Sequence, residues 1–195
     1  MLNLMHFKDR FNMRPFMISP TAIIRGVGRT LGIPLIEVEG ATGYYDSNLN
    51  GKAKAAAKAF KSNQYDFGFV HVKAVDDAGH DKDHKIKVEQ LEKSDRMIKT
   101  FIDEVKDDKD HDYIIIVTGD HTTPTQIGDH TFEPVPITMS AVSNILGRNK
   151  KLANLKDDVK TFDEIACGQG LDALLGRFSA IHIMPTAMKY RDKFN

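Results

Sequence analysis

The segment "VTGDHTTPTQIGDHTF", residues 117–132, contains the tetrapeptide Gly-Asp-His-Thr twice, nine residues apart. The first copy supplies Asp120 and His121 directly after "YIIIV", the most apolar run in the chain, and the second copy supplies Asp129 and His130. Aspartate and histidine side chains are costly to bury at the end of such a strand unless something binds them. The repeated pair therefore predicts a ligand site in this segment.

A second cluster of acids and histidines follows another apolar run. After "FGFVHV" comes "KAVDDAGHDKDH", residues 73–84, with Asp76, Asp77, His80, Asp81, Asp83 and His84. Asp76 and His80 are four residues apart, so in a helical turn both face one centre. Mixed carboxylate and imidazole ligands suit Zn²⁺, Mn²⁺ or similar ions, whereas a Ca²⁺ site uses oxygen alone. Two such ions clamp a phosphoryl group and activate a nucleophile, so the clusters predict a two-metal phosphoryl-transfer site.

The elements that must position these clusters alternate along the chain. Apolar runs predict strands over residues 14–18, 34–39, 66–72, 113–119 and 135–141. Amphipathic patterns predict helices over residues 20–32, 49–62, 84–107 and 161–176. This alternation indicates an α/β fold with a largely parallel sheet and helices on both faces. Ligands bind beyond the carboxyl ends of parallel strands, so we expect the two clusters to lie at one edge of the sheet.

The clusters also have a simpler interpretation, and two other motifs do not indicate a functional site. The stretch "DDAGHDKDHK" is also consistent with a solvated turn that caps the following helix. Among the other histidines, we interpret His6, His84 and His111 as surface residues and His71 as structural. The glycines of "RGVGRTLG" fall late in a predicted helix, so they do not indicate a dinucleotide site. Ser19 precedes Pro20, which is typical of a helix N-cap rather than a nucleophile.

The composition limits the class of protein. The 195 residues predict one domain, and Lys+Arg and Asp+Glu both number 27, so nothing favours nucleic acid or an acidic membrane surface as a partner. The one cysteine, Cys167, precludes an internal disulfide. No apolar run approaches the roughly 18–20 residues of a membrane span, and the first residues lack the pattern of a secretory signal. We therefore expect a cytoplasmic protein with no membrane contact.

Four motifs, in order along the chain, carry a resemblance to a known family. They are "GATGYYDSN" (40–48), "VHVKAVDDAGHDKD" (70–83), "TGDHTTP" (118–124) and "GDHTFEPVPITMS" (128–140). Together they resemble the archaeal-type cofactor-independent phosphoglycerate mutases of the alkaline phosphatase superfamily. The resemblance implies an alkaline-phosphatase-like metal domain that interconverts 3-phosphoglycerate and 2-phosphoglycerate in glycolysis. It also implies a phosphoserine intermediate, two divalent metal ions (Mn²⁺, Zn²⁺ or Co²⁺) and no requirement for bisphosphoglycerate.

The resemblance assigns roles to individual residues. Asp76, His80 and His130 match the ligands of one metal, and Asp120 and His121 match ligands of the second. The two Gly-Asp-His copies thus serve different metals, and neither Asp129 nor Asp77 is expected to be a ligand. Arg25 lies where a basic residue would contact the substrate phosphate.

The chain also departs from the family. Family members are about twice as long, and their early segment supplies another metal-binding aspartate and the serine nucleophile. Their inserted domain supplies most of the arginines that bind the glycerate. We therefore interpret residues 1–195 as the carboxyl-terminal part of a phosphatase-like metal-binding domain, without the amino-terminal segment and the inserted substrate domain. Such a chain is a fragment, a split-gene product that needs its other half in trans, or a degenerate paralogue.

Three functions compete on this basis. The first is the metal-binding half of a phosphoglycerate mutase, inactive alone because without the serine no phosphoryl-enzyme forms. The second is a metal-dependent phosphohydrolase of the same superfamily, in which an activated water attacks the phosphate. The third is a non-catalytic metal-binding module.

Overall fold

A computed structural model of the chain describes residues 4–149, 157, 159–169 and 175–192. The chain divides into two compact units. The first unit comprises the described residues up to Val105 together with Thr123–Asp129, and the second comprises Lys106–Thr122 and the described residues from His130 onward. The elements of the first unit are α1 (Phe7–Phe11), β1 (Pro15–Ile18), α2 (Ala22–Thr30), α3 (Leu49–Lys61), β2 (Phe67–Val70), α4 (Ala74–His80) and α5 (His84–Val105). Those of the second unit are β3 (Ile114–Thr118), β4 (Ile137–Ala141), α6 (Val142–Ile145), α7 (Glu164–Gln169), η2 (Ala180–His182) and α8 (Ile183–Arg191).

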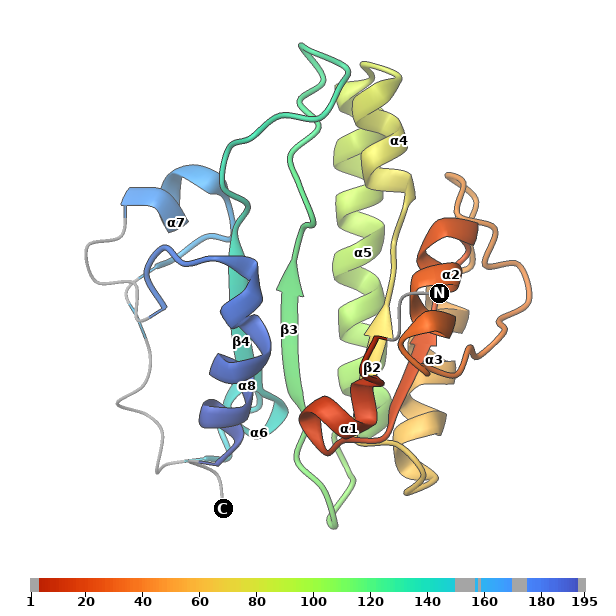
Figure 1. Cartoon of the computed structure of the whole chain (residues 1–195). Coiled ribbons are helices and arrows are strands. Elements are labelled where there is room, and N and C mark those ends of the chain that lie inside the picture. The colour runs from red at the N-terminus through yellow and green to blue at the C-terminus, as the bar shows by residue number, and fades with distance from the viewer. Residues whose placement is uncertain (1–3, 150–156, 158, 170–174, 193–195) are drawn as a thin grey trace. The chain divides into compact units, whose positions relative to one another are not determined.

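In the first unit, β1 and β2 form a parallel pair (Figure 1). Its register runs from Pro15 opposite Phe67 to Ile18 opposite Val70, and all four residues of β1 are buried. Helix α3 packs against α5, which packs in turn against α4 (Figure 1). The parallel pair thus sets the point at which the chain leaves β2 and enters α4.

The core of the first unit lies between β1 and α3. Phe16 and Ile18 of β1 are almost fully buried against Ala56 and Ala59 of α3. The Phe16 ring meets the Phe60 ring edge-on, with centroids 5.1 Å apart, an arrangement that aromatic pairs favour.

Two helices of the first unit begin at polar residues that accept backbone hydrogen bonds. The Asn48 side chain caps α3 by accepting from the backbone N–H of Gly51 at 2.8 Å. The Asp83 carboxylate accepts from the N–H groups of Lys85 and Ile86, at 2.9 and 3.0 Å, where α5 begins. Such caps satisfy N–H groups that have no partner within the helix. They explain why the predicted starts of these helices agree with the structure.

In the second unit, β3 and β4 form an antiparallel pair, with Ile114 opposite Ala141 and Thr118 opposite Ile137. The segment between them, residues 119–136, contains no helix. Parallel neighbours need a long crossover, usually helical, whereas antiparallel neighbours need none. The absence of a helical pattern between these strands is therefore a sequence signal for the antiparallel pairing.

The α/β class is confirmed, but a largely parallel sheet is not. The described strands form one parallel pair and one antiparallel pair, so β2 and β3 do not share a ladder. The strand predicted over 34–39 is wrong: only Leu35 bridges, to Met17 of β1. The helix predicted over 161–176 is confirmed for Glu164–Gln169, and residues 170–174 lie outside the described structure.

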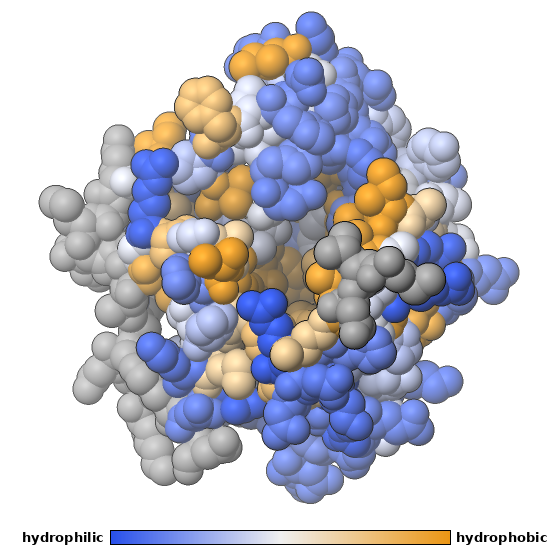
Figure 2. Space-filling view, viewed as in Figure 1, coloured by the Kyte–Doolittle hydropathy of each residue, from blue (hydrophilic) through white to orange (hydrophobic). Residues whose placement is uncertain are grey.

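Apolar side chains are exposed on parts of the surface. On the face seen in Figure 2, hydrophobic residues lie among hydrophilic ones. Helix α2 contributes Ile23 and Val27, which are 76% and 54% exposed and lie one turn apart. No helix among the described residues is long and apolar enough to cross a membrane.

Candidate metal centre

The helix α4 places Asp76 and His80 on one face. The chain enters α4 three residues after β2 ends, and the i, i+4 spacing brings Asp76 Oδ1 to 3.5 Å from His80 Nε2. Asp76 is largely buried, with 17% of its side chain exposed, and His80 is more open at 37%. A carboxylate oxygen and an imidazole nitrogen thus converge, as the spacing predicts.

Thr123 fixes the Asp76 carboxylate against the loop that follows β3. The buried Thr123 hydroxyl donates to Asp76 Oδ1 at 2.5 Å. The close approach depends on Gly79, because a Cβ at that position would lie 2.3 Å from the Thr123 carbonyl oxygen. Lys87 of α5 donates from Nζ to the same carbonyl at 2.6 Å. Helices α4 and α5 therefore hold Thr123 from two sides.

His80 has a defined orientation. Its Nδ1 lies 3.1 Å from the carbonyl oxygen of Gly128, and a carbonyl can only accept, so Nδ1 carries the proton. Nε2 then lies 3.5 Å from Asp76 Oδ1. Metal-binding histidines characteristically donate their other ring N–H to a carbonyl or carboxylate. This donor set fits a divalent ion.

Lys73 supplies a positive charge beside Asp76. Its ammonium contacts Asp76 Oδ2 and lies 2.9 Å from Asp77 Oδ1. Burial raises the pKa of Asp76, but hydrogen bonds from Lys73 and Thr123 and the charge of Lys73 outweigh burial and lower this pKa to about 2. Asp76 is therefore ionised at neutral pH, as a metal ligand must be. Asp77 is paired with the same ammonium.

In the second unit, the threonines that end the two Gly-Asp-His-Thr copies pair with each other. The Thr131 N–H donates to the Thr122 carbonyl at 3.0 Å, and the two threonine hydroxyls are 2.6 Å apart. His121 and His130 directly precede these threonines, and their ring centroids lie 3.7 Å apart. The sequence repeat thus makes a short antiparallel bridge that sets two imidazoles side by side.

Asp120 adds a carboxylate to the two imidazoles of the second unit. It is exposed, and its Oδ2 lies 3.4 Å from Nε2 of His121. Its Oδ1 accepts from the backbone N–H of His121 at 3.1 Å. Asp120, His121 and His130 therefore offer one carboxylate and two imidazoles within a single unit, and this chemistry suits Mn²⁺, Zn²⁺ or Co²⁺.

Arg25 and Ser19 are engaged with other protein groups. The Arg25 guanidinium pairs with Glu37 and donates from Nε to the Ser19 carbonyl at 2.9 Å. The N-cap of α2 is Thr21, so the prediction of Ser19 as N-cap is wrong by two residues. Ser19 Oγ accepts from the Thr21 N–H and lies 3.3 Å from His71 Nδ1, a neighbour that the sequence did not indicate. At 4% exposure, Ser19 is shielded from a substrate.

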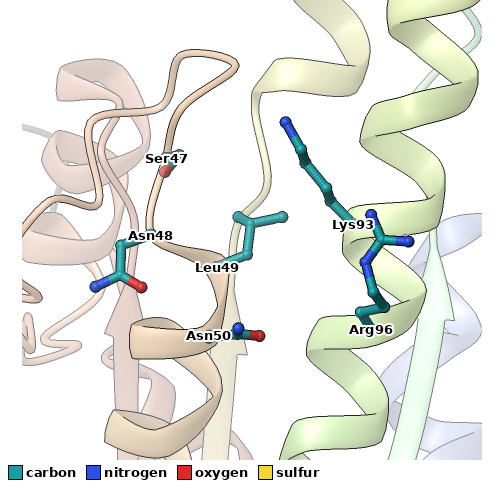
Figure 3. A pocket seen from close by; sticks show the side chains of 6 residues that line it. All are labelled: Ser47, Asn48, Leu49, Asn50, Lys93 and Arg96. Carbon is teal, nitrogen blue, oxygen red and sulfur yellow. The ribbon is translucent and has the colours of Figure 1, made fainter.

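A separate pocket of about 240 Å³ lies between the start of α3 and α5 (Figure 3). Its lining residues are Ser47, Asn48, Leu49, Asn50, Lys93 and Arg96. Asn48 is engaged as the cap of α3, and Lys93 donates to the Tyr45 carbonyl at 3.0 Å and pairs with Glu89. None of the predicted metal ligands lines this pocket.

Comparison with known proteins decides the family. The model of the metalloenzyme superfamily matches residues 2–162. The chain belongs to the metalloenzyme superfamily. This membership agrees with the carboxylate and imidazole groups gathered within each unit, because a family of metalloenzymes uses bound metal.

Individual proteins that are similar to this chain give more detail than the superfamily match. The 2,3-bisphosphoglycerate-independent phosphoglycerate mutase 1 of Methanocaldococcus jannaschii is 40% identical over 164 residues, which are 84% of this chain and 36% of that protein. The structure of the PH0037 protein from Pyrococcus horikoshii is 34% identical, with a TM-score of 0.81 over 97% of this chain and 52% of that one. A cofactor-independent phosphoglycerate mutase from Thermoplasma acidophilum, 24% identical, shares the fold with a TM-score of 0.64 over 95% of this chain and 39% of that one. The resemblance to archaeal mutases is thereby confirmed.

The chain is much shorter than these relatives. It spans between 33% and 40% of the length of the curated relatives it matches most strongly. Similarity therefore extends over most of this chain but over a minor part of each mutase.

Sequence reasoning missed the residues that support the proposed ligands. Thr123 and Lys73 contact Asp76 directly, and Gly79 allows the approach of Thr123. The signal for Gly79 was its place between the two predicted ligands of "DDAGH". No local signal marks Thr123, because its partner lies 47 residues away in the sequence.

Proposed function

We propose that this chain is the metal-binding part of a cofactor-independent phosphoglycerate mutase. Asp76, His80 and His130 hold one divalent ion, and Asp120 and His121 supply ligands of a second. Mn²⁺, Zn²⁺ and Co²⁺ all accept these ligands. When bound, the ions supply positive charge that orients and polarises the phosphoryl group of phosphoglycerate.

The observation that carries the proposal is a pair of contacts from α4 to one loop. Asp76 accepts from Thr123, and His80 donates to the Gly128 carbonyl. Thr123 follows His121 by two residues, and Gly128 precedes His130 by two. The two loop residues that α4 contacts are thus close in the sequence to the two proposed histidine ligands.

Several of this chain's own groups orient the proposed ligands. The Gly128 carbonyl holds the proton of His80 on Nδ1 and leaves Nε2 as the donor atom. Lys73 and Thr123 keep Asp76 ionised. Arg25 is a proposed phosphate contact, and its guanidinium pairs with Glu37 in this structure.

The serine nucleophile and the glycerate-binding arginines belong, by the resemblance, to parts of the mutases that this chain does not match. We therefore propose that the chain alone does not interconvert phosphoglycerates and needs those parts, in one longer protein or in trans. We also keep the cytoplasm as its predicted location. A metal-dependent phosphohydrolase is the second candidate, because the same ligands serve direct attack by water.

The test incubates the purified chain with Zn²⁺ and 3-phosphoglycerate and follows the products by ³¹P NMR. The proposal predicts no 2-phosphoglycerate and no inorganic phosphate from the chain alone. It predicts that 2-phosphoglycerate forms when the parts of the mutase that this chain lacks are supplied. Inorganic phosphate from the chain alone would favour the phosphohydrolase, and turnover to 2-phosphoglycerate by the chain alone would contradict the required second part.

A further inference from the structure

Lys52 is a fully buried lysine in the first unit. It lies on α3, and its relative exposure is 0%. Its Nζ donates to the carbonyl oxygen of His71 at 2.7 Å. Among the described residues it has no carboxylate partner, and burial lowers the pKa of its ammonium to about 8. At neutral pH the unit therefore encloses an ammonium that donates to one neutral carbonyl.

Such a group is costly to keep. Removing an ammonium from water costs several kcal/mol, and a single hydrogen bond to a carbonyl offsets only part of this. Apolar residues of similar volume often replace buried charges with no loss of stability. Lys52 is one of six buried residues of α3, and four of the others are alanines. Stability alone does not account for a lysine here.

The position of its acceptor indicates a different role. His71 is the first residue after β2, and the three residues His71–Lys73 connect β2 to α4. The His71 N–H donates to the Ile18 carbonyl of β1 at 2.9 Å, while Lys52 binds the His71 carbonyl from α3. Its ring nitrogen Nδ1 lies 3.3 Å from the Ser19 hydroxyl. The backbone is thus fixed on both sides where the chain turns toward α4.

We propose that Lys52 is a positioning residue for the metal site. Its ammonium fixes the His71 carbonyl and with it the direction in which the connection leaves β2. Helix α4 has only seven residues, so an error in this direction is transmitted to Asp76 and His80. The inference rests on the proposed function, because it assumes that Asp76 and His80 bind metal.

The test compares Lys52→Met with Lys58→Met, a change of an exposed lysine on the same helix. For each full-length variant, the dissociation constant of Mn²⁺ is measured by calorimetry and the free energy of unfolding by urea titration. We expect Lys52→Met to keep or exceed the stability of the unmodified chain while its Mn²⁺ dissociation constant rises about 10-fold or more, as for other residues that orient metal ligands. Lys58→Met should change neither quantity.

The other possible results also test the positioning role of Lys52. Unchanged Mn²⁺ affinity in a folded Lys52→Met variant overturns the positioning role. If Lys52→Met does not fold, Lys52→Gln, which keeps an N–H donor, takes its place and is expected to bind Mn²⁺ with intermediate affinity. Failure of both variants to fold assigns Lys52 to stability and overturns the inference. If the unmodified chain binds no Mn²⁺, the proposed metal site fails first, and the inference falls with it.

Discussion

The imidazole rings of His121 and His130 lie side by side, with centroids 3.7 Å apart. The threonines that directly follow them, Thr122 and Thr131, pair with each other and so bring the two rings together. The two Gly-Asp-His-Thr copies are therefore two halves of one small bridge. Metal ions of a two-metal site lie about 3.5–4 Å apart, so adjacent imidazoles are suited to bind neighbouring ions. This relationship gives the sequence repeat a structural purpose.

Replacing Thr123 by valine removes the hydroxyl that donates to Asp76. We expect the pKa of Asp76 to rise from about 2 and the Mn²⁺ dissociation constant at neutral pH to increase about 10-fold, because the carboxylate loses its orientation. Calorimetric titration measures the constant. Thr100→Val is the control, because that hydroxyl contacts the Arg96 carbonyl and Asn50 Oδ1 and none of the proposed metal ligands. Equal affinities for the two variants would argue against a role for Thr123.

Replacing Lys73 by methionine removes a positive charge that contacts Asp76 and Asp77. A metal cation at Asp76 is repelled by this ammonium, so we expect Mn²⁺ to bind roughly 3- to 10-fold more tightly at low salt. The gain should shrink at high salt because Lys73 is partly exposed. Lys85→Met, an exposed change at the start of α5, serves as control. Weaker binding by Lys73→Met would show instead that Lys73 orients the carboxylate.

Two glycine-to-alanine changes should act in opposite directions. Gly79→Ala places a Cβ 2.3 Å from the Thr123 carbonyl oxygen, so we expect the free energy of unfolding to fall by about 1–3 kcal/mol. Gly26→Ala in α2 meets nothing within 4 Å and should raise it by up to about 1 kcal/mol, through the higher helix propensity of alanine. Urea titrations measure both. A tolerated Gly79→Ala would mean that α4 and the loop can separate.

Lys52 should make stability depend on alkaline pH. Burial lowers its pKa from the ordinary value of 10.5 to about 8 in the folded chain, so between these values the unfolded chain binds more protons. The free energy of unfolding should therefore rise from about pH 8 to about pH 10.5. Urea titrations at pH 7.5 and 9.5 compare the unmodified chain with Lys52→Met, which should lack this part of the rise. An identical pH dependence in both would contradict the lowered pKa.

The helices and strands that the sequence predicted best are those with a clear local pattern of apolar residues. The amphipathic run predicted over 84–107 is α5, His84–Val105, and the apolar run predicted over 113–119 is β3, Ile114–Thr118. Residues 34–39 alternate as a strand should, yet only Leu35 bridges, since the pattern does not say whether a partner strand is in reach. Pairing depends on distant residues, which local periodicity does not report.

The residues of the candidate site also differ in whether the sequence could predict their roles. The i, i+4 spacing of Asp76 and His80 was readable because it needs one turn of helix. Thr123, Lys52 and the Gly128 carbonyl were not readable, because each acts across a large sequence separation on a group that another element positions. The ligands themselves have distinctive chemistry, whereas the groups that orient them are ordinary threonine, lysine and backbone.

The central claim is that the second Gly-Asp-His copy belongs to a working metal site through His130 and not through Asp129. Elemental mass spectrometry of the purified chain after equilibration with Mn²⁺ tests it directly, with His130→Ala beside the neighbouring control Asp129→Asn. We predict about one equivalent or more of Mn²⁺ in the unmodified chain and in Asp129→Asn, and a loss of about one equivalent in His130→Ala. Equal metal content in His130→Ala and the unmodified chain, or no metal in any of the three proteins, would contradict the proposed site.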